Sequence, residues 1–176
     1  MEQRLITKES RDLAVFDQLF IEAFPPSERV LPSTLVNVEF IKPLGFYEDG
    51  KPVGMMVIIN KYDFVFILFL ATFSEYRGQG IGSKIINAFY DSNPDILTVG
   101  SIEKPDDNAE NNAQRLSRQR FYERLGYTIH DLGIKFNGGD FLTIAKGKGS
   151  DNKETVAQQL NKLQSVVPEM LSAFGK

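Results

Sequence analysis

The chain has 176 residues, enough to bury the core of one ordinary domain, and its 42% hydrophobic and 24% charged residues are typical of a soluble globular protein. It has no cysteine, which excludes disulfides, thiolate nucleophiles and cysteine metal ligands, and its one histidine, His130, argues against a histidine triad or a multi-histidine metal site. The net charge of −3 argues against nucleic acid as the main partner. Because the sequence shows neither a signal peptide nor an apolar run long enough to cross a bilayer, we expect a cytoplasmic protein with no membrane partner and no metal.

The first part of the chain predicts four strands and two helices. The strands are expected over residues 4–7, 45–48, 52–59 and 64–71. Asp49-Gly50 is a strong hairpin signal, so we expect the last three of these strands to be antiparallel neighbours. A helix with one apolar face follows Ser10, its predicted N-cap, and stops at Pro25-Pro26. A second, short helix is expected over residues 32–40.

A glycine-rich turn, Arg77-Gly78-Gln79-Gly80-Ile81-Gly82, lies between the apolar strand 64–71 and the next helix. Such a turn leaves backbone N–H groups unpaired where the helix dipole is positive, and these groups bind phosphate oxygens. A Walker phosphate loop is excluded because no Gly-Lys-Ser/Thr is present. A dinucleotide-binding fingerprint is incomplete because Ser83 stands where its third glycine is needed. The turn therefore predicts a phosphate-binding site of another kind.

The second part of the chain predicts two helices and three strands. The strands are expected over residues 96–102, 128–130 and 140–145. A helix over residues 81–91 leads into the first of them, which should therefore run parallel to the strand 64–71. A polar loop and a basic helix follow, and Gly126 is the natural end of that helix. Gly138-Gly139 is expected in the turn between the last two strands.

Residues 150–176 predict a final helix with one apolar stripe. Asp151 and Glu154 have the spacing of a capping-box variant at its start, and Pro168 should bend or end it. The stripe comprises Val156, Leu160, Leu163, Val167, Met170 and Phe174. We therefore expect a domain over residues 1–149 and a helical extension over residues 150–176, packed on the same domain or at a homodimer contact.

Two motifs give the chain a family resemblance. Arg77, Gly80 and Gly82 fit the pattern Arg/Gln-x-x-Gly-x-Gly/Ala, and residues 121–127 (Phe-Tyr-Glu-Arg-Leu-Gly-Tyr) are similar to Phe/Leu-Tyr-Glu-Lys-Leu-Gly-Phe. With these motifs in the order glycine loop, helix, strand, helix, residues 70–127 resemble the GNAT superfamily of acetyl-CoA-dependent N-acetyltransferases. The resemblance implies an α/β (α+β) fold: a mixed, mainly antiparallel sheet of six to seven strands, flanked by helices, with a V-shaped splay between two parallel strands.

The resemblance also implies acetyl-CoA as co-substrate, with the glycine turn as the seat of its pyrophosphate and Lys84 adding positive charge. In the family a β-bulge, at the positions of Thr72 and Phe73, frees backbone groups that hold the pantetheine arm and polarise the thioester carbonyl. Arg115 and Arg118 stand where many members have an asparagine and a small residue, so they either contact CoA or an anionic part of the acceptor, or form a solvated basic face. The implied cofactor residues are Thr72, Phe73, Arg77, Gly78, Gln79, Gly80, Ile81, Gly82, Ser83, Arg115 and Arg118.

Two residues are implied in the chemistry. Tyr122 aligns with the tyrosine to which the family assigns the general acid that protonates the departing thiolate. Glu103, at the end of the strand 96–102, is the candidate base for the amine, with the carboxylates of the acidic loop after it as alternatives. Glu22 and Glu28 either face the acceptor or are ordinary surface residues.

The implied function is transfer of an acetyl group from acetyl-CoA to a primary amine of a small-molecule or peptide acceptor. Direct attack in a ternary complex is expected, because the chain has no cysteine to carry an acyl group. The net charge of −3 suits a cationic acceptor. Two alternatives stay open at this point: a non-catalytic module that binds CoA or acyl-CoA for regulation, and an unrelated phosphate-binding protein.

Overall fold

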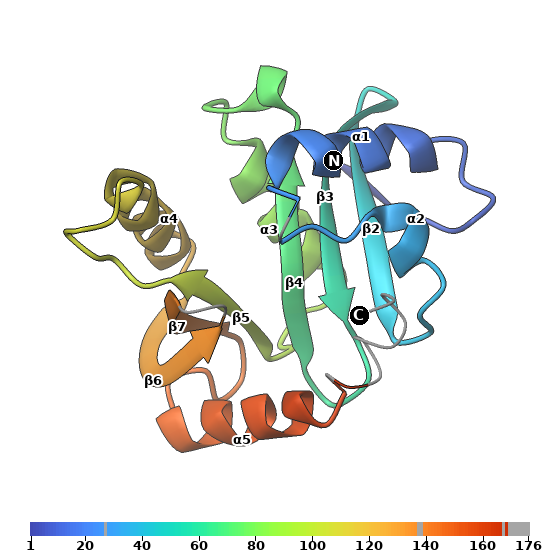
Figure 1. Cartoon of the computed structure of the whole chain (residues 1–176). Coiled ribbons are helices and arrows are strands. Elements are labelled where there is room, and N and C mark those ends of the chain that lie inside the picture. Colours follow the sequence, from blue (N-terminus) through green and yellow to red (C-terminus); the bar gives the residue numbers. More distant parts are fainter. Residues whose placement is uncertain (27, 137–138, 167, 169–176) are drawn as a thin grey trace.

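The computed structural model describes residues 1–26, 28–136, 139–166 and 168, which form a seven-stranded sheet flanked by helices (Figure 1). The strands are β1 (Glu2–Leu5), β2 (Ile41–Glu48), β3 (Lys51–Ile59), β4 (Val65–Thr72), β5 (Thr98–Glu103), β6 (Thr128–Phe136) and β7 (Gly139–Lys146). The helices are α1 (Leu13–Ala23), α2 (Pro32–Leu35), α3 (Ile81–Ser92), α4 (Asn112–Arg124) and α5 (Lys153–Gln164), with a 3₁₀ turn over Ser74–Tyr76. The strand order is β1-β2-β3-β4-β5-β7-β6, and within these residues only β4 and β5 pair in parallel. The predicted α/β fold with a mixed, mainly antiparallel sheet is confirmed.

The start of α1 differs from the prediction. Its N-cap is Asp12 rather than Ser10, and no side chain caps the helix. The hydroxyl of Ser10 instead accepts the N–H of Thr7 (2.9 Å). Asp12 is occupied elsewhere, because its carboxylate accepts the hydroxyl proton of Tyr47 (3.0 Å) from the neighbouring sheet. A long-range hydrogen bond has therefore replaced a local cap.

The segment between α1 and β2 has less helix and more strand than the sequence pattern predicts. The pattern favours a helix to Phe40 and a strand from Gly45, but α2 ends at Leu35 and β2 begins at Ile41. Phe40 and Ile41 are 7% and 2% exposed. Their burial in the core explains why the strand begins early.

The parallel strands β4 and β5 separate towards their carboxyl ends. They pair only over Val65–Ile67 and Thr98–Gly100. Beyond that point β4 stays paired with β3, and β5 stays paired with β7. Figure 1 shows the two strands together at the base of the sheet and apart above it. The predicted V-shaped splay is confirmed, and it divides the sheet into a β1–β4 half and a β5–β7 half.

The irregularity in β4 lies at Leu68, which is the extra residue at the register shift between β3 and β4. Thr72 pairs regularly with Gly54, and the N–H of Phe73 donates to the carbonyl of Val53 (3.2 Å). The bulge position implied by the resemblance, at Thr72 and Phe73, is therefore wrong for this chain.

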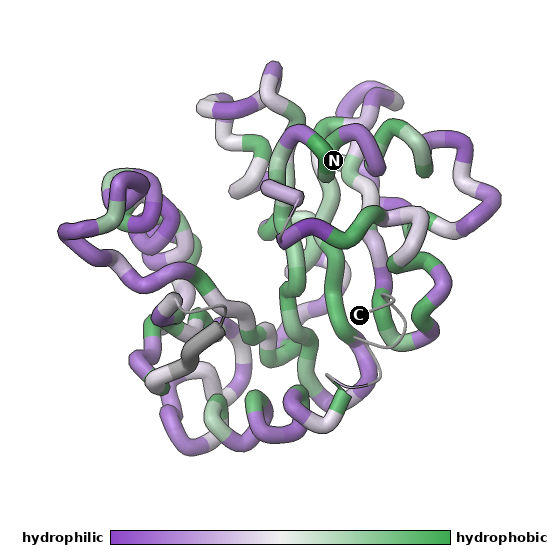
Figure 2. Tube along the Cα trace, viewed as in Figure 1, coloured by the Kyte–Doolittle hydropathy of each residue, from purple (hydrophilic) through white to green (hydrophobic). Residues whose placement is uncertain are grey.

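Two apolar layers cover the two faces of the sheet. The α1 face is covered by α1, α2 and α5, whose buried residues include Phe16, Phe20, Leu35 and Val156. The α3 face is covered by α3 and α4, whose buried residues include Ile81, Ile85, Phe89 and Tyr122. Figure 2 shows hydrophobic residues gathered on the central strands and hydrophilic residues over much of α4 and α5. The splay thus opens between two well-packed layers.

The described part of α5 packs against the core of the α1 face, where Val156 and Val166 are 0% and 1% exposed. The N-cap is Asn152, whose side chain accepts the N–H of Thr155 (2.8 Å), so the predicted cap at Asp151 is one residue too early. In the residues that the structure describes, no helix is long and apolar enough to span a membrane. Outside them lie Gly138, Val167, Met170 and Phe174.

Candidate active site

The glycine-rich turn forms a row of unpaired backbone donors at the start of α3. Gly78 and Gly80 have φ angles of +76° and +75°, in the left-handed region that residues with a Cβ disfavour. Gly80 is the N-cap of α3, and no side chain caps this helix. Within the described residues, the N–H groups of Gly78, Gly80, Ile81, Gly82 and Ser83 donate to no protein acceptor. Because these groups lie at the positive end of the helix dipole, the turn can bind an anion.

Three residues in or beside the turn make contacts within the protein. A Cβ at Gly82 would lie 3.3 Å from Cζ of Phe121, so this glycine allows α3 to approach α4 closely. The side-chain amide of Gln79 folds back and donates to a backbone carbonyl of the preceding 3₁₀ turn (2.6 Å). The ammonium of Lys84 pairs with Glu48 (2.8 Å). The charge of Lys84 is thereby neutralised by a carboxylate of β2.

The turn opens into a cleft of about 1040 Å³ between the two halves of the sheet. The cleft is lined by the diverging ends of β4 and β5, the start of α3, one face of α4 and the end of α1. Most of the predicted site residues line it: Thr72, Arg77, Gly78, Gly80, Ile81, Gly82, Ser83, Glu103, Arg118 and Tyr122. The predicted residues outside its lining are Phe73, Gln79 and Arg115.

β4 turns unpaired peptide groups towards this cleft. The N–H of Phe73 donates to Val53 on β3, and strand residues alternate, so Ala71 also directs its peptide groups towards β3. The N–H and C=O groups of Leu70 and Thr72 then face the side from which β5 has separated. Both residues line the cleft. This edge of β4 can accept an extended chain as an added strand.

Tyr122 lines the cleft from α4, and its side chain is almost fully buried, at 7% exposure. Its ring makes edge contacts with Phe121 and Tyr127, at centroid distances of 5.0 and 5.1 Å. Burial raises the pKa of Tyr122 to about 12, an increase that the positive charge of Arg118 opposes. Among the described residues its hydroxyl has no hydrogen-bond partner. At neutral pH the hydroxyl is therefore protonated and free to donate.

Ion pairs link Glu103 on β5 to α4. One carboxylate oxygen of Glu103 lies 3.1 Å from Nη2 of Arg115, and the other lies 2.8 Å from Nη1 of Arg118. Arg115 also donates to the side chain of Asn111 (2.8 Å) and to the carbonyl of Lys104 (3.0 Å). All three guanidinium nitrogens of Arg115 are thus used within the protein. The described contacts of Arg118 use Nη1 alone, and Arg118 lines the cleft.

These contacts set the protonation state of Glu103. Burial raises its pKa, but hydrogen bonds from Arg118 and Asn111 and the charges of Arg118 and Arg115 outweigh burial, so the pKa of Glu103 lies below its ordinary value. A carboxylate with a lowered pKa is a weaker base. Its geometry instead suits it to hold two arginines against β5.

Residues 43–129, from β2 to β6, match the family described as an acetyltransferase (GNAT) domain. This part of the chain is a GNAT acetyltransferase domain. This match includes both the glycine turn and Tyr122. No protein of curated function matches the sequence.

Solved structures share the fold of this chain. A protein from Bacteroides thetaiotaomicron described as an acetyltransferase of the GNAT family aligns with a TM-score of 0.78 and 17% identity, over 95% of this chain and 97% of that one. An aminoglycoside 6′-N-acetyltransferase complexed with coenzyme A has a TM-score of 0.61 and 15% identity, over 84% and 97% of the two chains. A GNAT acetyltransferase from Elizabethkingia anophelis with acetyl-CoA bound has a TM-score of 0.57 and 14% identity, over 83% and 97%. At these identities the likeness concerns the fold.

Sequence reasoning missed several residues that line the cleft of the GNAT domain. These include Gln114 and Ser117 on α4 and Asn111 at its N-cap. Steps of four, four and three back from Tyr122 reach Gln114 and Asn111, and a step of four back from Phe121, which also lines the cleft, reaches Ser117. Elsewhere in the lining the missed residues are Phe24, Leu68, Phe69, Ser101 and Phe141. They come from four segments far apart in the sequence, and no local pattern predicts that they meet.

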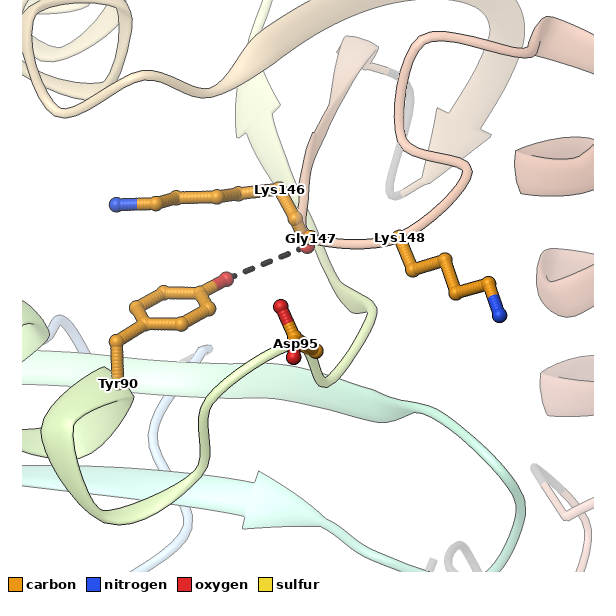
Figure 3. A pocket seen from close by; sticks show the side chains of 5 residues that line it. All are labelled: Tyr90, Asp95, Lys146, Gly147 and Lys148. Carbon is orange, nitrogen blue, oxygen red and sulfur yellow. Dashed lines mark hydrogen bonds between the residues drawn. The ribbon is translucent and has the colours of Figure 1, made fainter.

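A second hollow, of about 600 Å³, lies between the end of α3 and the end of β7 (Figure 3). The hydroxyl of Tyr90 donates to the carbonyl of Lys146 (3.3 Å). The ammonium of Lys146 donates to the carbonyl of Leu125 at the end of α4 (2.8 Å) and lies 4.4 Å from the centroid of the Tyr90 ring. These groups hold α3, α4 and β7 together, and none of the predicted site residues lines this hollow. The cleft is therefore the candidate active site.

Proposed function

We propose that this GNAT protein transfers an acetyl group from acetyl-CoA to a primary amine by direct attack, while both substrates occupy the cleft. The observation that carries the proposal is that one cleft contains both the row of unpaired N–H groups from Gly78 to Ser83 and the protonated hydroxyl of Tyr122. Two structures of the same fold were solved with coenzyme A or acetyl-CoA, which supports the choice of co-substrate.

The start of α3 is the proposed seat of the pyrophosphate. The unpaired N–H groups and the helix dipole both favour negative charge there. Arg77 is exposed, lines the cleft and adds a full positive charge beside the turn. Of the two arginines on α4, Arg118 is the one placed to contact CoA or the acceptor, because Arg115 is saturated by protein partners.

The edge of β4 is the proposed seat of the pantetheine arm. The N–H and C=O groups of Leu70 and Thr72 face the cleft there. They can form hydrogen bonds with the pantetheine amides, as a strand edge does with an added strand. An N–H from this edge would donate to the thioester oxygen as negative charge develops on it. Donors of this kind typically contribute about 10²- to 10³-fold in rate.

In the proposed reaction the lone pair of a neutral amine attacks the thioester carbon. A C–N bond forms, the C–S bond breaks, and CoA leaves as a thiolate. Tyr122 passes its proton to the sulfur, and the proton lost by nitrogen returns through water to the phenolate. The positive charge of Arg118 stabilises that phenolate in the interval. The chain has no cysteine, so it offers no acyl-thioester route.

Within this proposal Glu103 positions arginines and does not act as the base. Its two oxygens are held by Arg115 and Arg118, which lower its pKa. A base needs a pKa near the working pH to accept a proton efficiently. The role of Glu103 in this proposal is to hold Arg118 near Tyr122.

Amine-dependent release of free thiol from acetyl-CoA tests the proposal, alongside calorimetry of CoA binding. We expect Arg77→Gln to weaken CoA binding by about fivefold. The control Lys84→Gln should leave it unchanged, because Lys84 pairs with Glu48 away from the cleft. CoA binding without thiol release on any amine would favour the regulatory module. A larger rise in melting temperature with ATP than with CoA would favour an unrelated phosphate-binding protein.

A further inference from the structure

The wall of the cleft on the α1 side is apolar and aromatic. Phe24 comes from the end of α1, and Leu68 and Phe69 come from β4. Successive residues of a regular strand point to opposite faces, but Leu68 and Phe69 both pack against the core of the α1 face because Leu68 is the extra residue of the bulge. The rings of Phe24 and Phe69 lie 5.1 Å apart, and both are partly exposed. The bulge thus places two neighbouring apolar side chains on the side of the cleft opposite α3.

An uncompensated carboxylate stands beside this wall. Glu28 lines the cleft, is exposed and has no ion-pair partner among the described residues. The other carboxylate in the lining, Glu103, is paired with Arg115 and Arg118. Glu28 is therefore the carboxylate of the lining that is available to a cationic ligand.

Arg29 holds the turn that carries Glu28. The N–H groups of Glu28 and Arg29 donate to the carbonyl of Pro25 (3.0 and 3.2 Å). The guanidinium of Arg29 donates to the carbonyls of Ile21 (3.1 Å) and Phe24 (3.4 Å) in the last turn of α1. The side chain of Arg29 thus binds the end of the helix while its backbone N–H binds Pro25, and these contacts hold Glu28 in the turn that follows Phe24.

From this arrangement we infer that the acceptor is a small amine carried on an apolar group of aromatic size, whose ammonium form is bound by Glu28 and loses one proton to solvent water before the nitrogen attacks. The inference rests on the proposed acetyl transfer and specifies its acceptor. The apolar group packs against Phe24, Leu68 and Phe69, where burial of carbon surface contributes to binding. A second ammonium, as in a polyamine, would meet either the apolar wall or the positive charges of Arg118 and Arg124, which line the opposite side.

The test compares three amines in the thiol-release assay with the full-length protein: 2-phenylethylamine, ethylamine and spermidine. We expect kcat/KM for 2-phenylethylamine to exceed that for ethylamine by roughly 10- to 100-fold, the effect of burying one aromatic group. Spermidine should be used less well than 2-phenylethylamine.

Two matched variants separate the role of Glu28 from a general effect of charge. Glu28→Gln should raise KM for 2-phenylethylamine by about tenfold with kcat and CoA affinity little changed, because it removes the ammonium partner and keeps the shape. Glu22→Gln should change none of these values. Its carboxylate accepts the amide of Gln18 (3.1 Å) and lies outside the lining of the cleft.

The outcomes distinguish the inference from the proposed function. If spermidine or ethylamine is used as well as 2-phenylethylamine, or if Glu28→Gln behaves like Glu22→Gln, the inference is wrong and acetyl transfer stands. If CoA binds but none of the three amines is acetylated, the inference is wrong while the cofactor seat stands. If CoA does not bind, the proposed function fails, and the inference fails with it.

Discussion

Replacing Tyr122 with phenylalanine removes one hydroxyl group and keeps the ring contacts with Phe121 and Tyr127. The hydroxyl has no partner among the described residues, so stability should change by less than about 1 kcal/mol. A thiol has a pKa near 8.5, so its thiolate leaves moderately well without a proton. The fall in kcat should therefore be at the low end of the range for loss of a general acid. We therefore expect kcat to fall by about 10- to 100-fold, or roughly 1.4 to 2.7 kcal/mol.

The assay pairs thiol release with calorimetry of CoA binding and a melting curve. Tyr127→Phe is the matched control, because its hydroxyl is also buried and its ring touches Tyr122, yet it lies outside the lining of the cleft. Both variants should melt near the wild-type temperature, and only Tyr122→Phe should lose kcat. An unchanged kcat, or an equal loss of CoA affinity, would refute the assignment of Tyr122 as the general acid.

Three further variants probe the turn, the ion pairs and the last helix. Gly80→Ala should cost about 1 kcal/mol of stability, because φ is +75° there, and should weaken CoA binding measured by calorimetry. Glu103→Gln should lower stability at pH 7. The pKa of Glu103 is lowered in the fold, so the wild-type carboxylate stabilises above its unfolded pKa, near 4.3, and that contribution is lost as pH falls through the folded pKa. Urea titrations should therefore show a larger difference between the two proteins at pH 7 than at pH 3. Val156→Ala should lower the free energy of unfolding by about 2 kcal/mol in the same titration, because Val156 is fully buried on the inner face of α5.

Several features were decided by a few adjacent residues and could be predicted from the sequence. Gly78 and Gly80 take the left-handed conformation that the turn requires. Asp49 and Gly50, with φ angles of +50° and +74°, form the hairpin between β2 and β3. The apolar strand 64–71 and the amphipathic helix after the turn also formed as predicted, within a residue or so. These features rest on backbone preferences and side-chain periodicity, which depend little on the rest of the fold.

The tertiary structure alone decided what each group in the cleft can do. The sequence placed Glu103 at the end of a strand, but its low pKa comes from Arg115 and Arg118, which reach it across space from α4. Likewise the N–H of Phe73 is used by β3, and the bulge at Leu68 is visible only in the pairing of β3 with β4. Periodicity in a sequence shows which residues share a face. It does not show which charged group or which strand lies opposite that face. These neighbours set the protonation state, the hydrogen bonds and the exposure of each side chain in the cleft.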